Sequence, residues 1–365
     1  MQKTLFYFFL LVVFSFGDLN TVQAQKLENE TVFKDYAHVS SYKKLKKRNP
    51  EVFQGNKKKK NYFEGWYFKM VSEKGNSIMS IIPGISLSEN GEEQHAFIQL
   101  IDGKTAKTYY YTYPIEEFAF SKKKFAIRIQ NNYFSEDSIV LNIQNDSTSI
   151  TGKVRMTNPI KLTKKGKKLN IMGWYKSAPF MQCYHGVVSL NHDLSGSLQM
   201  NNKTYQFDKG LGYIEKDWGK SMPSAWIWIQ SNNFSSPNTS FMLSVANVPW
   251  MGSSFPGFLG FFLNDSLITR FGTYSGAKVE LDTTNSNTIK ITITDKEYTY
   301  YLEATRNKAG ILKAPVKGAM DRRIAESVDA QLKLRVTDKK GVVIFNDTTS
   351  IAGLETVGDL STLSK

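Results

Sequence analysis

An alternation of apolar and polar residues with a period of two runs through most of the chain from Tyr62 onward. Residues 288–294 read Thr-Ile-Lys-Ile-Thr-Ile-Thr, and residues 125–129 and 138–143 alternate in the same way. Successive side chains of a strand point to opposite faces, so this period predicts strands that turn one face to a core. The turn-forming pair 295–296 separates two such segments, as expected of an antiparallel hairpin.

Many short strands of this kind are typical of β-barrels and β-sandwiches, and the sequence predicts an all-β fold. Helical periodicity is scarce, and only residues 317–328 could hold a few turns of helix. Turn-forming residues cluster near 201–210. We therefore expect an N-terminal β domain at 62–205, a C-terminal β domain at 206–358 and a short tail at 359–365.

The N-terminus has the pattern of an export signal. Lys3 supplies a basic start, residues 5–16 are apolar except for one serine, and Val22-Gln23-Ala24 is a small-x-small triplet. The apolar run is shorter than the about 20 residues of a membrane-spanning helix. We predict a signal peptide at 1–24 and a periplasmic, extracellular or envelope-associated protein. A retained N-terminal anchor is the alternative.

Positive charge is concentrated in a few segments of a chain with a net charge of +14. Between Lys43 and Lys60 there are nine basic residues and one acid, and further lysine clusters lie at 122–124 and 164–168. Residues 25–61 are expected to form a basic polar lead-in, loosely wrapped or partly disordered. The lysine clusters predict solvated loops, with an anionic membrane or cell-wall polymer as a possible partner and no nucleic acid.

Several common catalytic motifs are absent from the sequence. Its four histidines have no metal-ligand spacing, and it contains no glycine-rich phosphate loop and no Gly-x-Ser-x-Gly turn. Cys183 is the only cysteine, which excludes an internal disulfide. We therefore expect no metal and no cofactor.

The first candidate site segment is residues 62–69, Tyr-Phe-Glu-Gly-Trp-Tyr-Phe-Lys. As a strand it places Glu64 and Trp66 on one face and Tyr67 on the other. The simpler interpretation is that these aromatic residues fill a core.

The second segment, residues 213–220, contains Glu215 and Asp217 two residues apart. In a strand they share a face, with their side chains about 7 Å apart. Trp226 and Trp228 follow with the same spacing. A carboxyl in apolar surroundings keeps its proton at neutral pH and can act as an acid, which makes these two carboxyls and Glu64 candidates. Pairing with lysines or backbone amides is the alternative.

The third segment brings Cys183 and His185 to one strand face, which suggests a thiol nucleophile. Neighbours on one strand face rarely approach closely enough to exchange a proton. His185 alone, as an acid, base or hydrogen-bond donor, is the more plausible role. A histidine satisfied within a core is the alternative.

Residues 63–68 and 213–219, continuing into the tryptophan strand at 226–232, resemble the tocopherol cyclase family. Segments 302–304, 312–315 and 351–355 support the resemblance, which extends from about Tyr62 to Gly358. It implies two lipocalin-like (calycin) antiparallel β domains packed around a hydrophobic cavity. The plant members have Asn at the position of Asp217, which implies that Asp217 is not an acid shared by the whole family.

The resemblance also implies an activity, in which a prenylated hydroquinone is closed to a chromanol by adding a phenol hydroxyl across an alkene. Such an isomerase needs an acid, aromatic faces around the cation and a proton acceptor. It implies Glu215 or Asp217 as the acid and His185 or Tyr67 as the acceptor. The lining would be formed by Trp66, Trp218, Trp226 and Trp228. A non-catalytic carrier of a hydrophobic ligand and a surface-binding protein remain alternatives.

Overall fold

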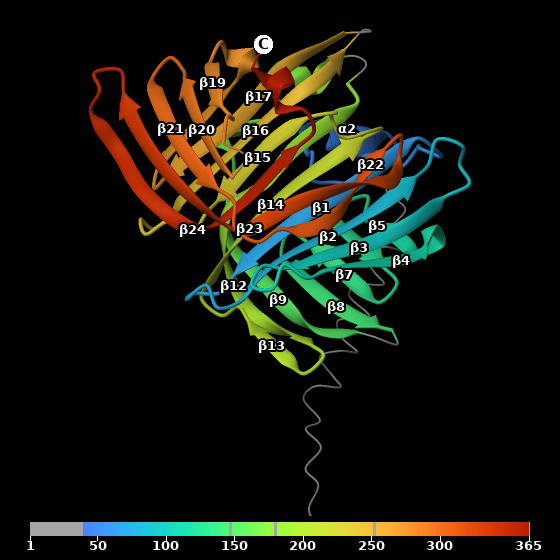
Figure 1. Cartoon of the computed structure of the whole chain (residues 1–365). Helices are drawn as coiled ribbons and strands as arrows, with labels where there is room; N and C mark the ends of the chain where they lie inside the picture. Colours follow the sequence, from blue (N-terminus) through green and yellow to red (C-terminus); the bar gives the residue numbers. More distant parts are fainter. Residues whose placement is uncertain (1–38, 146–147, 179–180, 251–252, 286, 365) are drawn as a thin grey trace, which may run out of the picture.

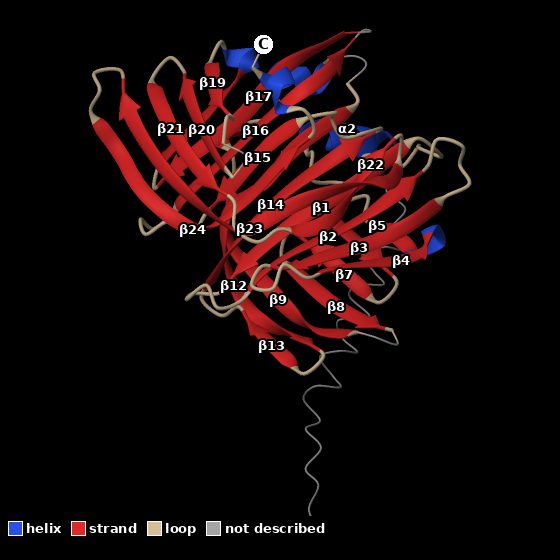
Figure 2. Ribbon diagram, in the orientation of Figure 1, coloured by secondary structure: helices blue, strands red, loops and turns tan. Residues whose placement is uncertain are grey.

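The computed structural model describes residues 39–145, 148–178, 181–250, 253–285 and 287–364, and strands dominate it (Figures 1 and 2). The predicted signal peptide and the beginning of the basic lead-in lie outside these ranges. Within the described residues, no helix combines the length and the apolar character needed to cross a membrane.

The N-terminal half forms a twelve-stranded sheet. Its strands are β1 (Tyr62–Val71), β2 (Ile78–Leu87), β3 (Gln94–Asp102), β4 (Thr108–Pro114), β5 (Phe118–Phe120), β6 (Ala126–Ile129), β7 (Asn132–Ser135), β8 (Ser138–Gln144), β9 (Ser149–Ile160), β12 (Cys183–Met200), β13 (Lys203–Gln206) and β14 (Gly210–Gly219). Their order is β4-β3-β2-β1-β14-β12-β9-β8-β7-β6-β5, with β13 beside β12. A small hairpin of β10 (Thr163–Lys164) and β11 (Lys167–Lys168) and the 3-10 helix η2 (Gly173–Ser177) connect β9 to β12.

The C-terminal half forms a ten-stranded sheet. Its strands are β15 (Trp226–Ser231), β16 (Thr239–Trp250), β17 (Ser253–Asn264), β18 (Leu267–Gly272), β19 (Lys278–Asp282), β20 (Thr288–Thr294), β21 (Tyr298–Thr305), β22 (Gly310–Val316), β23 (Ala319–Asp338) and β24 (Val343–Val357). Their order is β18-β17-β16-β15-β24-β23-β21-β20-β19, with β22 beside β23. The 3-10 helix η4 (Leu360–Leu363) follows the last strand.

Both sheets follow the same path. Four strands form a meander, and a short 3-10 helix then carries the chain to the far edge of the sheet, η1 (Ile115–Glu117) in the first and η3 (Thr273–Ser275) in the second. The returning strands end beside the first one, β14 against β1 and β24 against β15. Each sheet therefore curls into a nearly closed barrel with antiparallel neighbours, which confirms the predicted all-β class.

The period-two pattern sorts side chains into three apolar layers. One layer fills the first barrel, one fills the second, and a third lies between the two sheets. Trp66, Phe68 and Ile214 belong to the first core. Ile227, Ile229 and Leu332 belong to the second core. Tyr67, Tyr213, Trp228 and Val328 belong to the layer between the sheets. Burying each large apolar side chain contributes about 1.5–3 kcal/mol, so both barrels are held by filled interiors.

The expectation of helix at 317–328 is wrong, because most of this segment lies in β23. Its residues pair with β22 on one side and with β24 on the other, as in the register Glu326↔Glu355. Val328 is buried between the sheets. Pairing on both edges and burial on the apolar face outweigh the weak helical preference of the local sequence.

The chain passes from the first sheet to the second between β14 and β15. The turn-forming residues near 201–210 instead close the β12–β13 hairpin and lead into β14, which is still part of the first sheet. That residues 62–205 and 206–358 are two separate domains remains a prediction.

The described part of the basic lead-in packs on the first core. It forms α2 (Val39–Arg48) and then crosses the first core as a strap (residues 49–55), in which Val52 and Phe53 are buried. Glu64 accepts hydrogen bonds from the backbone amides of Gln54 and Gly55 at 2.8 and 2.9 Å. The strap therefore covers one end of the first barrel.

Candidate active site

A cavity of about 190 Å³ lies between the two sheets, walled by strands of both. Its lining is mostly apolar and aromatic, with polar groups gathered in a few places. Of the residues singled out in the sequence, it contains Tyr67, Cys183, His185, Glu215, Asp217, Trp226 and Trp228. A mostly apolar pocket with a few convergent polar groups is the usual form of a small-molecule site.

Strand alternation explains which of these residues reach the cavity. On β1, Phe63, Gly65 and Tyr67 face it, and on β14 Glu215 and Asp217 do so. The register pairs Tyr67 with Glu215, so these two side chains lie next to each other on the same face of the sheet.

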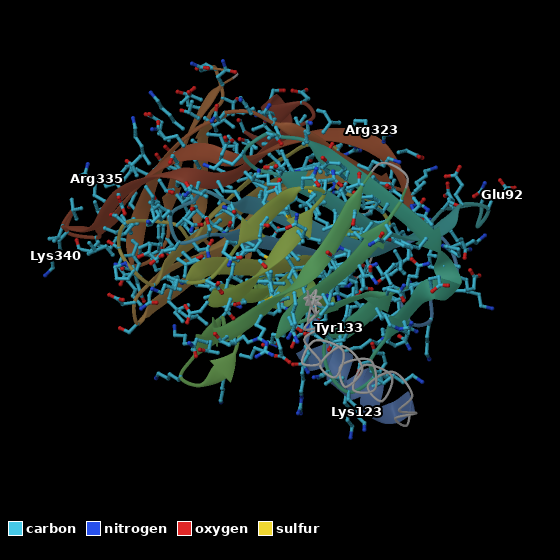
Figure 3. The ribbon with its side chains drawn as sticks, turned by 90° about the horizontal axis from the view of Figure 1, so that it is seen from below. Glu92, Lys123, Tyr133, Arg323, Arg335 and Lys340 are labelled. Atoms are coloured by element: carbon cyan, nitrogen blue, oxygen red, sulfur yellow. The ribbon has the colours of Figure 1, made fainter. Side chains whose placement is uncertain are left out.

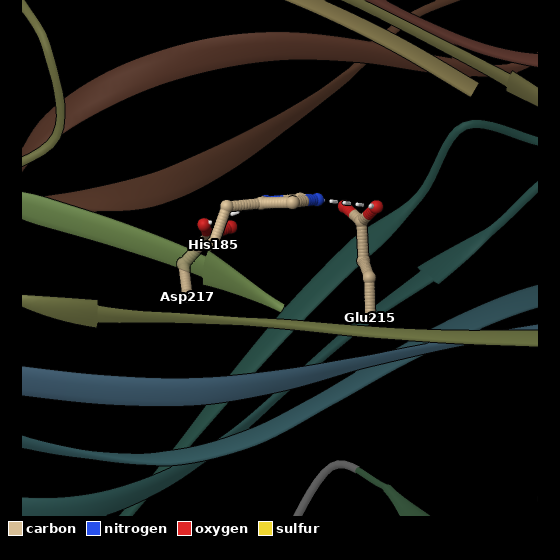
Figure 4. Close-up of side chains that lie close together, drawn as sticks. All are labelled: His185, Glu215 and Asp217. Atoms are coloured by element: carbon tan, nitrogen blue, oxygen red, sulfur yellow. Dashed lines mark hydrogen bonds and ion pairs between the residues drawn. The ribbon is translucent and has the colours of Figure 1, made fainter. Parts of the chain in front are cut away.

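His185, Glu215 and Asp217 form a cluster on β12 and β14 (Figure 4). His185 Nδ1 lies 2.9 Å from Asp217 Oδ1, and its Nε2 lies 3.5 Å from Glu215 Oε2. Burial lowers the pKa of His185, but the two carboxylates outweigh burial and raise the pKa to about 10. At neutral pH the imidazole is therefore a cation held between two carboxylates.

Glu215 accepts further hydrogen bonds on the same oxygen. The Tyr213 hydroxyl donates to Oε2 at 2.7 Å, and the Trp228 indole N–H donates at 3.2 Å. Oε2 of Glu215 therefore faces two hydrogen-bond donors and the imidazole of His185.

The same three side chains could together hold a divalent cation. One nitrogen of His185 and one carboxylate oxygen each from Glu215 and Asp217 lie within 4.8 Å of one another. These ligand types are compatible with zinc or another transition metal.

A pair of carboxyl groups that the sequence pattern did not reveal lies on β23 and β24. Glu355 lines the cavity and stands directly opposite Glu326, which is fully buried. Burial raises the pKa of Glu355 well above its usual value, and the Glu326 charge raises it further. Burial also raises the pKa of Glu326, to about 7. Two carboxyls this close retain a proton at neutral pH because both cannot easily ionise together.

Each member of this carboxyl pair has an aromatic partner. The Trp226 indole N–H donates to Glu355 Oε2 at 2.6 Å. The Tyr67 hydroxyl donates to Glu326 Oε1 at 2.5 Å and accepts a hydrogen bond from Ser80 at 2.8 Å. Tyr67 therefore stands between Glu215, its neighbour in the sheet, and the Glu326–Glu355 pair.

Lys69 is buried behind this pair, on the same face of β1 as Tyr67. Burial lowers the pKa of its ammonium to about 7, although Glu326 acts in the opposite direction. Its Nζ donates to the carbonyl of Ile351 at 3.0 Å and to the side-chain oxygen of Gln230 at 3.2 Å. Lys69 thus links the first sheet to β15 and β24.

Trp228 owes its position to a glycine on the neighbouring strand. A Cβ atom at Gly353 would lie 2.4 Å from the Trp228 ring. The indole therefore occupies the space that any larger residue would fill, and this places its N–H at Glu215. Tyr67 packs edge-on against the same indole, with ring centroids 5.3 Å apart.

The cavity does not include Glu64, Trp66 and Trp218 among its lining, contrary to the expected roles. They share the opposite strand face with Lys216 and point into the first barrel. Lys216 Nζ lies 2.5 Å from Glu64 Oε1 and 4.6 and 4.9 Å from the centroids of the Trp66 and Trp218 rings. It also donates to the carbonyls of Pro50 and Val52. Together these contacts fasten the strap.

Cys183 lines the cavity close to Asp217, at 4.0 Å from Sγ to Oδ1. Burial raises the pKa of the thiol well above its usual value, and Asp217 adds to the effect. The thiolate is the nucleophilic form of cysteine, so these surroundings do not favour a nucleophilic Cys183.

Comparison with known proteins agrees with the predicted resemblance. A family model described as tocopherol cyclase-like matches residues 157–358, a range that includes His185, Glu215, Asp217, Glu326 and Glu355. The chloroplastic tocopherol cyclase of Zea mays is 24% identical over 206 residues, which cover 53% of this chain and 43% of that protein. A probable chloroplastic tocopherol cyclase of Oryza sativa subsp. japonica is 24% identical over 204 residues, with the same coverage. The matched region spans less than half the length of these two relatives.

The fold also has a relative among solved structures. The crystal structure of CghA with Sch210972 superposes with a TM-score of 0.51 at 9% identity, covering 81% of this chain and 89% of that one. At this identity the likeness concerns the fold alone. The family model spans more than half of the chain and contains most of the residues around the cavity. The chain belongs to the tocopherol cyclase-like family.

Proposed function

We propose that the chain is a cyclase that closes a prenylated hydroquinone, or a related lipophilic isoprenoid, into a ring by acid–base catalysis. One observation carries the proposal: a single apolar cavity presents a carboxyl that keeps its proton, Glu355, together with a carboxylate held by donors, Glu215. Membership of the tocopherol cyclase-like family supports the reaction class.

In the proposed reaction, Glu355 transfers its proton to the less substituted carbon of the alkene. The resulting tertiary cation is stabilised by the faces of Trp226, Trp228 and Tyr67, which line the same cavity. The phenol oxygen of the substrate bonds to the cationic carbon, and its proton passes to Glu215. The oxonium ion formed in this step is a strong acid, so a carboxylate already held by donors can accept its proton. Substrate and product are isomers, and the electrons balance without an oxidant.

The protein must then return the proton from Glu215 to Glu355. Tyr67 lies beside Glu215 in the β1–β14 register and donates to Glu326, which stands opposite Glu355. These groups supply a short route inside the protein by which the proton returns from Glu215 to Glu355. His185 contributes as a cation that holds Glu215 and Asp217 in place.

This assignment replaces Glu215 and Asp217 as the proposed acid. Glu215 faces two hydrogen-bond donors and an imidazolium, and Asp217 pairs with the same imidazolium. Hydrogen-bond donors directed at both residues suit them to the role of proton acceptor in the proposed reaction.

The decisive experiment incubates the purified protein with a prenylhydroquinone and looks for a chromanol of unchanged mass by chromatography. Glu355→Gln is expected to abolish turnover while ligand binding, followed by quenching of tryptophan fluorescence, persists. Glu303→Gln, which alters a partly exposed carboxyl on β21 outside the cavity, is the matched control. Tight binding by the unaltered protein without conversion would overturn the cyclase proposal in favour of a lipid carrier.

We also propose that the protein acts outside the cytoplasm, in the periplasm, on the envelope or beyond it. The basic start, the apolar run and the small-x-small triplet at residues 1–24 support export. Determination of the N-terminal residue of protein isolated from its source tests the proposal. A protein that retains residues 1–24 in the cytosolic fraction would contradict it.

A further inference from the structure

A row of aromatic side chains leads from the cavity to the surface. Tyr175 and Phe255 line the cavity, with ring centroids 6.2 Å apart. Trp174 packs on Tyr175 with a centroid distance of 4.2 Å, and Trp250 packs on Phe255 at 6.4 Å. Trp174 is 59% exposed and Trp250 is 38% exposed. We call these four residues the aromatic rim.

Basic side chains border the aromatic rim. Two neighbouring surface hollows, of about 420 and 400 Å³, share Lys168 and Lys176 in their walls. The first hollow also contains Trp174 and Arg270, and the second contains Lys47 and Arg48 from the end of α2. The described lining of both hollows includes no acidic residue. We call Lys47, Arg48, Lys168 and Lys176 the basic band.

The charges of the basic band are only partly balanced nearby. Lys168 forms an ion pair with Glu51 at 2.6 Å, whereas the other three side chains are exposed to solvent. The band therefore presents positive charge beside the exposed Trp174, and the aromatic rim continues from Trp174 through Tyr175 and Phe255 to the exposed Trp250. This combination is characteristic of surfaces that bind anionic membranes, because tryptophan settles at the headgroup level and lysine or arginine contributes about 1 kcal/mol each near anionic lipid.

We propose that the aromatic rim and the basic band together form a docking surface for an anionic phospholipid bilayer. Docking places the aromatic rim, and the cavity behind it, against the lipid. A lipophilic ligand can then pass between bilayer and cavity along Tyr175 and Phe255 without crossing water. This inference rests on the proposed function for the identity of the ligand, but the docking itself does not depend on turnover.

The surface is tested with the purified protein and two kinds of vesicle, phosphatidylcholine alone and phosphatidylcholine with phosphatidylglycerol in equal parts. Sedimentation with the anionic vesicles is expected for the unaltered protein. The double variant Lys47→Glu/Lys176→Glu should lower this partition by about tenfold or more, because each lost basic residue removes about 1 kcal/mol. The matched control Lys339→Glu/Lys340→Glu makes the same charge change at the tip of the β23–β24 hairpin, where Lys340 projects from the molecule (Figure 3).

A second measurement tests the aromatic rim. Brominated phosphatidylcholine in the anionic vesicles should quench tryptophan fluorescence of the unaltered protein, and Trp174→Phe/Trp250→Phe should remove most of this quenching. Equal sedimentation of the Lys47→Glu/Lys176→Glu variant and its control would overturn the proposal. So would inorganic phosphate binding to the basic band in the absence of any vesicle binding, which would indicate a site for a soluble anion.

The test also separates docking from catalysis. With substrate dissolved in neutral detergent, the Lys47→Glu/Lys176→Glu variant should turn over as fast as the unaltered protein, and with substrate in anionic vesicles it should be slower. A protein that binds vesicles through this surface but converts no prenylhydroquinone would retain the docking proposal and refute the cyclase proposal.

Discussion

The hydroxyl of Tyr67 donates a hydrogen bond of 2.5 Å to Glu326, a residue 259 positions away in the chain and in the other sheet. The bond joins two regions, β1, where Tyr67 is the register neighbour of Glu215, and the Glu326–Glu355 carboxyl pair on β23 and β24. It therefore provides a direct means of testing whether the two regions act together.

Tyr67→Phe keeps the aromatic ring but removes this bond. We expect turnover to fall by about a hundredfold, because the return of the proton to Glu355 loses its internal route. Ligand affinity should change little, since the ring still packs on Trp228. Steady-state kinetics measure the effect, and Tyr301→Phe on the exposed face of β21 is the control. An unchanged kcat would remove Tyr67 from the reaction cycle.

Glu326→Gln should move the alkaline limb of the pH–rate profile to lower pH. The Glu326 charge adds to the effect of burial in raising the pKa of Glu355, so its removal lets Glu355 lose its proton at lower pH. The profile of kcat/KM against pH reports the shift. A variant that had only lost stability would show a lower rate, but the alkaline limb of its profile would stay at the same pH as in the unaltered protein.

Protonated His185 is expected to stabilise the fold in a defined pH range. Its pKa is about 10 in the folded protein against 6.5 when unperturbed. Its contribution is therefore complete below about pH 6.5 and is lost as the pH rises through about 10, at no more than about 1.4 kcal/mol per pH unit.

Urea unfolding of the unaltered protein and of His185→Asn at a series of pH values measures this contribution. The difference between their free energies of unfolding should shrink between those two pH values. Burial lowers the pKa of His95, so His95→Asn should show no such trend above about pH 6.5. A constant difference for His185→Asn across the range would show that the histidine is not held as a cation.

Lys216→Met should destabilise the protein by about 3–5 kcal/mol, because it leaves Glu64 charged and buried without its partner. Lys333→Met breaks the pair with Glu303, which is partly exposed to solvent, and should cost less than about 1 kcal/mol. Denaturant unfolding compares the two variants. Similar small losses from both would show that the buried Lys216–Glu64 pair stabilises the fold no more than the partly exposed pair does.

Gly353→Ala should displace Trp228 and weaken ligand binding, since the added methyl would overlap the indole. Gly65→Ala provides the comparison at the same cavity, because its Cβ would make only ordinary contacts, the closest at 3.5 Å to Ile82. Fluorescence titration with a prenylhydroquinone should show a larger loss of affinity for Gly353→Ala. Equal affinities would indicate that Trp228 is not part of the binding site.

The alternation of residues along β1 and β14 predicted the faces of these strands correctly. It separated Tyr67 from Trp66, and it placed Glu215 beside Asp217. The pattern could not show which face meets the cavity, because both faces are buried. Glu64 and Trp66 turned out to face a filled barrel, where a lysine from the neighbouring strand compensates the acid.

The carboxyl pair could not be predicted, because its two members come together only through the β23–β24 register. Glu326 lies in the segment expected to be helical, and Glu355 stands out in the sequence only as part of a segment that resembles the family. A glutamate within an otherwise alternating strand, such as Glu326 in β23 or Glu355 in β24, gives no local sign that its side chain is buried. Their exposure depends on the other sheet, which covers them.

The binding cavity lies between two barrels, each of which has its own filled interior. Substitutions in the cavity lining between the two sheets can therefore alter which ligands the cavity binds. They leave the packing inside either barrel unchanged. The ligand specificity of such a protein can therefore change in evolution with little loss of stability. A ligand bound in this cavity contacts both halves. The two halves are therefore expected to unfold together when the ligand is bound.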